Sequence, residues 1–395
     1  MLRSEKNFRL YFYGSVTSDF GTWLQNTAQV LLAYRLAHSV FAVGLVTFAQ
    51  FSSPLVLGPW AGVMADRFGG RRTLLGTQIL SAVVSIALAS LDLAGALTEW
   101  WLVGGAILSG LAFTFALPAR NVTVQRLVRP EHTRPAYVMD AVSYNIGRAV
   151  APLLTWLVGP LGNDFAWAFF ANAASFTVFT AILWWADQHG TEEPKVRSRV
   201  IAGFAIAIHD RSILILLAMV AAVTVADDPI LVLGPALATH LHESAQWSGA
   251  FIAALGAGSV IGSLRRANPQ PRFRRAAIAL AMLGICMIVF VLAQSILVSI
   301  IAAFGAGVSC LIANSATRTL LAKAARPHGV AAVMAVYAIA WAGSKPVASL
   351  IDGLLGSHIG LAWTGFILAV PALIPIGVVA LILGFRRPPE PIPQP

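Results

Sequence analysis

Apolar residues run along the chain in long blocks separated by short polar stretches, a pattern that predicts membrane-spanning helices. A helix that crosses the hydrocarbon core of a bilayer needs about 20 mostly apolar residues. Twelve such blocks follow one another: 9–35, 42–64, 73–94, 99–119, 135–159, 164–186, 212–237, 245–264, 275–293, 296–317, 329–355 and 360–385. The pattern therefore predicts an all-α polytopic membrane protein with twelve transmembrane helices.

The two halves of the chain carry similar motifs at matching positions. The second block ends with the Gly-x-x-x-Gly pair Gly58/Gly62 and the eighth with Gly258/Gly262, and such pairs let helix backbones approach closely. We expect two parallel six-helix repeats, with a substrate site between them near the membrane midplane. The predicted parts are the repeats 1–187 and 212–386, a cytoplasmic linker at 188–211 and a short Pro-rich tail at 387–395. A short apolar piece of the linker, 200–208, is expected to lie along the membrane surface.

Composition agrees with a membrane domain. Of the 395 residues, 57% are hydrophobic and only 11% are charged, whereas soluble domains carry about 25% charged residues. The net charge is +10, but the bases form short clusters between apolar blocks, without the basic stripe that nucleic-acid binding needs. All Lys and Arg residues except Arg35, Arg148 and Lys345 fall at the termini or in the loops that follow even-numbered blocks. The positive-inside rule then predicts that both termini are cytoplasmic.

One loop carries a family signature. The sequence from Gly62 to Arg72, Gly-Val-Met-Ala-Asp-Arg-Phe-Gly-Gly-Arg-Arg, resembles the loop G-x-x-x-D-R-x-G-R-R of the major facilitator superfamily, at its expected place between the second and third helices. Gly70 stands where a basic residue is usual. The resemblance implies that Asp66 lies near the start of the eleventh helix in one state, favoured by the helix dipole. It also implies a gating role for Gly62, Asp66, Arg67, Gly69, Arg71 and Arg72, whose bases would make ion pairs that latch the cytoplasmic gate.

Other stretches resemble a branch of that superfamily. Asn7-Phe-Arg9, the run from Phe20 to Ala28, and Ala116-Leu-Pro-Ala-Arg120 are similar to the enterobactin-exporter type. The run from Asn145 to Pro152 is similar to the fifth-helix motif of exporters, with Ala151 where Gly is usual. The resemblance implies a monomeric secondary transporter of the bacterial cytoplasmic membrane that works by alternating access. It would export a siderophore-like metabolite or a drug-like amphipathic compound with a proton as the coupling ion.

Ionisable residues inside the predicted spans are candidates for coupling. Such residues are costly in a bilayer and have to be paired or face water. We expect Asp19 to pair with Arg148, and Asp227 or Asp228 to pair with Lys345. The polar side chains Gln25, Asn26 and Asn145 are candidates for a substrate cavity. The alternative is that these pairs only hold helices together.

Other kinds of chemistry find little support. The two cysteines, Cys286 and Cys310, sit in apolar blocks without metal-ligand spacing, and no nucleotide-binding Gly-x-x-x-x-Gly-Lys-Ser/Thr loop is present. His240-Leu-His242-Glu243 lacks the further ligands of a metal site. We therefore expect no cofactor, no metal and no nucleic-acid partner, only a small-molecule substrate, a coupling ion and the lipid bilayer. The alternatives that stay open are uptake of a small organic solute, an intramembrane enzyme, and a sensor that has lost transport.

Overall fold

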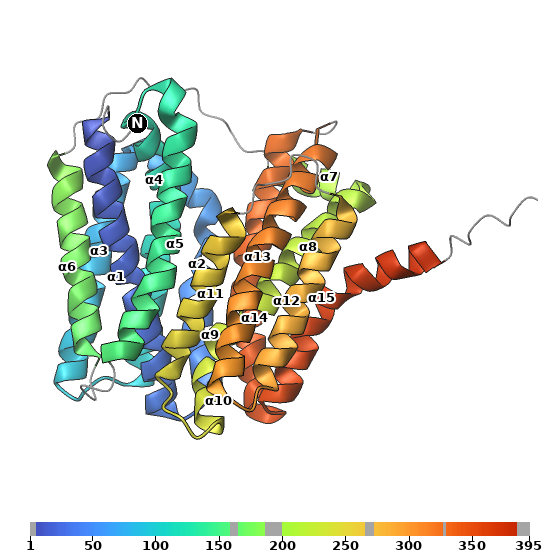
Figure 1. Cartoon of the computed structure of the whole chain (residues 1–395). Coiled ribbons are helices and arrows are strands. Elements are labelled where there is room, and N and C mark those ends of the chain that lie inside the picture. The colour runs from blue at the N-terminus through green and yellow to red at the C-terminus, as the bar shows by residue number, and fades with distance from the viewer. Residues whose placement is uncertain (1–4, 159–164, 186–199, 265–271, 327–328, 385–395) are drawn as a thin grey trace, which may run out of the picture.

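The computed structural model describes residues 5–158, 165–185, 200–264, 272–326 and 329–384. Within these ranges the chain is helical and has no strand, and every predicted span is found as one helix except the seventh, which is broken into three (Figure 1). The first six spans are α1 Lys6–Ala37, α2 Val40–Phe68, α3 Gly70–Leu93, α4 Glu99–Arg126, α5 Thr133–Val158 and α6 Ala166–Trp185, with a 3₁₀ turn η1 at Pro130–His132 before α5.

The later spans follow the same pattern, with one interruption. They are α8 Arg211–Asp227, α9 Pro229–Val232, α10 Gly234–His240, α11 Trp247–Leu264, α12 Phe273–Val291, α13 Ile296–Ala324, α14 Val330–His358 and α15 Leu361–Gly384. The seventh predicted span is broken into α8, α9 and α10 because Pro229 and Pro235 cannot continue the hydrogen-bond ladder of a preceding helix. The break leaves Asp227 and Asp228 at the end of α8, inside the bundle.

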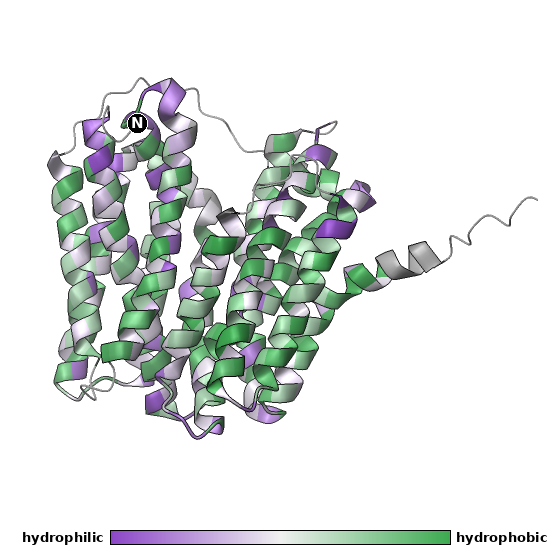
Figure 2. Ribbon diagram, viewed as in Figure 1, coloured by the Kyte–Doolittle hydropathy of each residue, from purple (hydrophilic) through white to green (hydrophobic). Residues whose placement is uncertain are grey.

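The outer surface of the bundle suits a bilayer. Among the described residues, nine helices are long and apolar enough to cross a membrane, and Trp247–Ser263 is a shorter apolar helix. Large apolar side chains face outward, such as Trp185 at 83% exposure. Figure 2 shows hydrophobic residues along the helices and hydrophilic residues gathered toward the ends of the bundle. The polytopic membrane prediction is therefore confirmed.

The helices pack as two groups. Helices α1–α6 pack among themselves, as do α8–α15, and the groups meet where α2 packs on α14 and α5 packs on α11 (Figure 1). The boundaries drawn from the sequence stay a prediction. The predicted tail and most of the predicted linker lie outside the described residues. The described part of the linker forms α7, Val200–His209, in which Gly203 packs against Val336 of α14.

The two ends of the bundle differ. We call the end at which α1 begins and α2 ends the basic end, because Lys6 and Arg67 lie there. At the opposite end the halves interlock. Gly353 of α14 lies 3.1 Å, measured from a Cβ placed on it, from the Gly44 Cα of α2, and Tyr34 of α1 shares a hydrogen bond of 2.8 Å with Thr239 of α10. Figure 1 shows the two groups diverging toward the basic end.

The two Gly-x-x-x-Gly pairs behave differently. Gly258 and Gly262 of α11 face the backbone carbonyl oxygens of Phe304 and Val308 of α13, so the second pair does permit close packing of helices. A Cβ on Gly58 or Gly62 of α2 would meet no atom within 4 Å. The expectation of close packing is therefore wrong for the first pair in this conformation, because the side of α2 that carries these two glycines faces open space.

Candidate functional site

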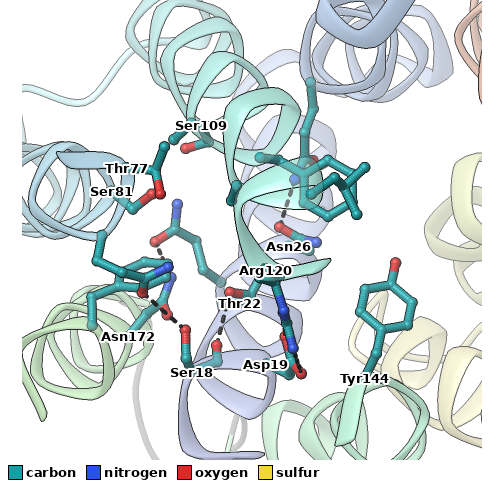
Figure 3. A pocket seen from close by; sticks show the side chains of 18 of the residues that line it. Ser18, Asp19, Thr22, Asn26, Thr77, Ser81, Ser109, Arg120, Tyr144 and Asn172 are labelled. Carbon is teal, nitrogen blue, oxygen red and sulfur yellow. Dashed lines mark hydrogen bonds and ion pairs between the residues drawn. The ribbon is translucent and has the colours of Figure 1, made fainter. Parts of the chain in front are cut away.

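A small polar cavity lies inside the first group of helices (Figure 3). Its volume is about 70 Å³. Because one water needs about 10–15 Å³ on this measure, the cavity has room for a few waters or one small polar group. Each of the six helices around it contributes polar side chains to its lining: Ser18, Asp19, Thr22, Gln25, Asn26, Gln50, Thr77, Gln78, Ser81, Ser109, Arg120, Tyr144 and Asn172.

Hydrogen bonds between helices fix this lining. Gln50 of α2 donates to the Asn26 side chain of α1 at 2.7 Å. The Gln25 side-chain oxygen accepts from Ser85 at 2.6 Å and from Asn172 at 2.8 Å. Two of the predicted cavity residues, Gln25 and Asn26, therefore do line a cavity. Their amides are held by α2, α3 and α6, so the polar wall is already formed without a ligand.

The charged edge of the cavity is built around Arg120 of α4. Its guanidinium lies 2.7 Å from the Asp19 carboxylate of α1 and 2.9 Å from the Asp140 carboxylate of α5. Ser143 donates to Asp19 at 2.6 Å, and Tyr11 donates to Asp140 at 3.0 Å. We call Arg120, Asp19 and Asp140 the Arg120 cluster. Charged hydrogen bonds of this forked kind are short and directional, so the cluster fixes α1, α4 and α5 relative to one another.

The predicted partner of Asp19 was wrong. Asp19 pairs with Arg120 and not with Arg148. The sequence placed the end of the fourth span at 119 and left Arg120 in a loop, but α4 continues to Arg126 beyond Pro118. Extending the helical pattern by two turns would have brought Arg120 into the bundle. Asp140 was missed as well, although it lies in the first half of α5.

Arg148 forms an ion pair between the two groups of helices. Its guanidinium lies 3.0 Å from the Asp227 carboxylate at the end of α8. It also lies over the ring of Trp23 of α1, 5.6 Å from the centroid, a position that adds cation–π attraction. Both charged side chains are 13% exposed. This pair therefore joins α5 of the first group to α8 of the second inside the bundle.

Lys345 of α14 lies beside Asp228, as predicted. Its ammonium is 3.7 Å from the Asp228 carboxylate and 4.5 Å from the centroid of the Phe51 ring. Ser349, one turn further along α14, donates a hydrogen bond to the same carboxylate. Asn145 instead donates to the Ala141 carbonyl of its own helix at 2.8 Å and does not line the cavity. The coupling role of these residues stays a prediction.

The signature loop is a tight junction between α2 and α3. Gly69 has φ of +83°, a value that favours glycine. A Cβ on Gly70 would lie 2.9 Å from the Ala119 carbonyl oxygen of α4. This close approach is a physical reason for glycine at a place where the resemblance leads one to expect a basic residue.

The bases of the loop make contacts within the first group. Arg71 donates to the Leu183 carbonyl at 2.8 Å and to the Trp184 carbonyl, so it binds the negative end of the α6 dipole. The Arg67 guanidinium lies 5.6 Å from the Phe68 ring centroid, and Arg72 is exposed. The Asp66 side chain lies outside what the structure describes. The latch expected from the resemblance stays a prediction.

Sequence comparison assigns most of the chain to a protein family. The model of the Major Facilitator Superfamily matches residues 11–348. Over 186 residues the chain is 24% identical to the uncharacterized MFS-type transporter YfiS of Bacillus subtilis, covering 46% of this chain and 43% of that protein. Over 163 residues it is 27% identical to the putative multidrug resistance protein MdtD of Cronobacter sakazakii, covering 40% and 33%. The aligned part thus spans less than half the length of either relative.

Solved structures share the fold. A bacterial homolog to the human lysosomal transporter Spinster, in an inward-facing and unoccupied conformation, has a TM-score of 0.76 at 13% identity, with 98% of each chain covered. An auto-inhibited POT family peptide transporter has a TM-score of 0.70 at 14% identity, with 99% of each chain covered. Twelve spans, two helical groups and a family match over most of the sequence agree: the chain belongs to the Major Facilitator Superfamily.

Proposed function

We propose that this protein is a secondary active exporter that works by alternating access, with a proton gradient as its driving force. The observation that carries the proposal is the Arg120 cluster at the edge of a polar cavity, where one cation holds two carboxylates from different helices. Protonating one carboxylate would remove an ion pair and weaken the link between α1, α4 and α5. Such a change shifts the balance between two conformations only by the difference in binding free energy between them.

The orientation supports a cytoplasm-facing conformation. If the basic end is cytoplasmic, as the positive-inside rule predicts, the interlocked end faces outward and is closed in this structure. Gly58 and Gly62 at the basic end then have room to pack against a partner in the opposite conformation. With that orientation we expect the protein to lie in a bacterial inner membrane with both termini in the cytoplasm.

The direction of transport and the substrate rest on likeness. The fifth-helix run from Asn145 to Pro152 resembles exporters, and a relative carries the name of a putative multidrug resistance protein. A cavity of about 70 Å³ is too small for a whole siderophore-like molecule, since typical ligand pockets are about 300–1,000 Å³. We infer that the body of such an amphipathic substrate binds between the two groups of helices and that only a polar part of it enters the cavity.

Uptake of a small polar solute is the second candidate. The small volume and the amide-rich wall of the cavity suit a small polar solute, and they do not set the direction of transport. The two are separated by deleting the gene and comparing small molecules in cells and medium by mass spectrometry, with and without iron. Export predicts a compound retained in the cells and depleted outside. A solute left unused in the medium would instead support uptake and contradict export.

A further inference from the structure

A buried carboxyl group on α14 has no role in the ion pairs described so far. Asp352 is fully buried, and neither of its carboxylate oxygens has a hydrogen-bond donor among the described residues. It lies three residues after Ser349 and seven after Lys345, on the face of α14 from which both of those side chains reach the Asp228 carboxylate. Two carboxylates in contact repel each other, and a buried carboxylate without a donor is costly. The arrangement therefore has one acidic group that is not stabilised as an anion.

The Arg120 cluster makes the contrast clear. It also contains one cation and two carboxylates, but both of its carboxylates receive hydrogen bonds, Asp19 from Ser143 and Asp140 from Tyr11, besides those from Arg120. In the second group of helices, Lys345 and Ser349 both approach Asp228. The Asp352 oxygens are left without a donor.

We propose that Asp228 and Asp352 hold one exchangeable proton between them. A proton on Asp352 lets its O–H group donate to Oδ1 of Asp228, which lies 3.7 Å from the Lys345 ammonium and otherwise has no hydrogen bond. Lys345, the Asp228 carboxylate and the neutral Asp352 acid then carry no net charge together. Release leaves an Asp352 carboxylate and passes H⁺ to water. No three His, Cys, Asp or Glu side chains of the described chain form a metal-binding group, so a proton suits the pair better than a metal ion.

The neighbouring elements bring few other titratable groups to the pair. Asp227 is next in sequence and is neutralised by Arg148, and Cys310 of α13 lies on the side of Asp227. Helices α9 and α15 contain no titratable side chain, nor does the part of α2 around Gly44 that packs here. Lys345 is therefore the cation that decides how many carboxylates the site holds as anions.

The position of Asp228 and Asp352 along the bundle indicates the end from which a proton would reach them. Asp352 is six residues from the end of α14 at His358, about 9 Å along the helix axis at 1.5 Å per residue. The adjacent Gly353 packs against Gly44, where the two groups interlock. Opening the interlocked end would expose the pair to that side. This directional part rests on the proposed function, whereas the shared proton does not.

Infrared spectroscopy of the purified full-length protein tests the shared proton without any substrate. At neutral pH the wild type should show a C=O stretching band of a protonated carboxylic acid that disappears at alkaline pH. Asp352→Asn should remove that band, and Asp352→Glu should shift it. The matched control Asp92→Asn, which changes a buried carboxyl group paired with Arg35 outside the cluster, should keep it.

Three results would overturn the inference. They are absence of the band in the wild type, an unchanged band in Asp352→Asn or Asp352→Glu, and a thermal stability that rises with Na⁺ at constant pH in the wild type but not in Asp352→Asn. The last result would assign a sodium ion to the pair. If the wild type shows the band but no proton-driven transport, that result would count against the proposed function alone. Because Asn is isosteric with a protonated Asp, Asp352→Asn should fold and keep its stability where the wild type loses stability at alkaline pH.

Discussion

The guanidinium of Arg148 and the carboxylate of Asp227, 3.0 Å apart, form a buried ion pair between the two groups of helices. The pair lies over Trp23, about halfway along α1, so any movement that separates α5 from α8 has to break or stretch it. Removing one partner of a buried pair leaves an uncompensated charge and costs about 3–5 kcal/mol. Asp227→Asn should therefore lower the free energy of unfolding of the detergent-solubilised protein by about that amount.

Two further variants make this stability measurement specific. Arg35→Gln breaks a more exposed pair with Asp92, in which Arg35 is 41% exposed and the distance is 3.7 Å, and should cost only about 0–1 kcal/mol. Replacing Arg148 and Asp227 together by Met and Leu should recover most of the loss. Equal costs for Asp227→Asn and Arg35→Gln would show that the buried pair has no special structural role.

Replacing Arg120 by lysine, which keeps the positive charge but not the guanidinium, should impair transport. Lysine cannot reach Asp19 and Asp140 with a planar fork of donors. Arg120→Lys should reduce the rate of proton-driven transport in proteoliposomes at least tenfold, which corresponds to a rise of about 1.4 kcal/mol in the activation free energy. Asp19→Asn should leave substrate exchange intact but make it insensitive to a pH gradient.

The control for the transport assay is Glu243→Gln, which changes an exposed acid in the loop after α10 by the same chemical step. It should transport like the wild type. Full proton-driven transport by Asp19→Asn at all pH values would remove Asp19 from coupling and leave the Arg120 cluster as a structural element.

The hydropathy pattern predicted the twelve spans because apolar length is a property of the sequence alone. Partners inside the bundle depend on how each helix is rotated, and hydropathy does not encode that rotation. Hence Asn145, predicted to line the cavity, bonds instead to the carbonyl of Ala141 on its own helix. Asp19 was assigned the wrong partner because the predicted fourth span ended before Arg120. The residues of α14 beside Asp228 show which signal was available: Lys345, Ser349 and Asp352 recur at i, i+4 and i+7, which places them on one helix face.

Two glycines of α3 should respond in opposite directions to the same change. Gly70→Ala places a methyl group 2.9 Å from the Ala119 carbonyl oxygen of α4, and overpacking of this kind costs about 1–3 kcal/mol. Gly76 has open space at that position, so Gly76→Ala should stabilise the helix by about 0.5–1 kcal/mol. The midpoint of thermal unfolding measures both. A Gly70→Ala variant as stable as Gly76→Ala would refute the close approach of α3 and α4.

The start of α1 should loosen in acid. Glu5 contacts His132 at 2.8 Å and Arg129 at 3.7 Å, and the hydrogen bond from His132 is the main cause that lowers the pKa of Glu5 below its usual 4.5. A lowered pKa means that the contact stabilises the fold above pH 4.5 and that this contribution is lost as pH falls through the lower value.

Hydrogen exchange in the first turns of α1 measures this loss. At neutral pH the wild type should exchange more slowly than Glu5→Gln, and this difference should shrink as pH falls through the lowered pKa of Glu5 and vanish at the lowest pH. A constant difference across pH would show that the Glu5 charge does not hold this segment.

Alternating access itself is tested most directly by two distances measured in one protein. With Cys286 and Cys310 replaced by Ala, spin labels on Trp60→Cys and Val330→Cys report the basic end, and labels on Leu36→Cys and His240→Cys report the interlocked end; all four sites are exposed. The account predicts reciprocal changes on acidification: the first distance shortens and the second lengthens, and Asp19→Asn weakens this response to pH. Two distances that stay fixed, or that lengthen together, would contradict alternating access.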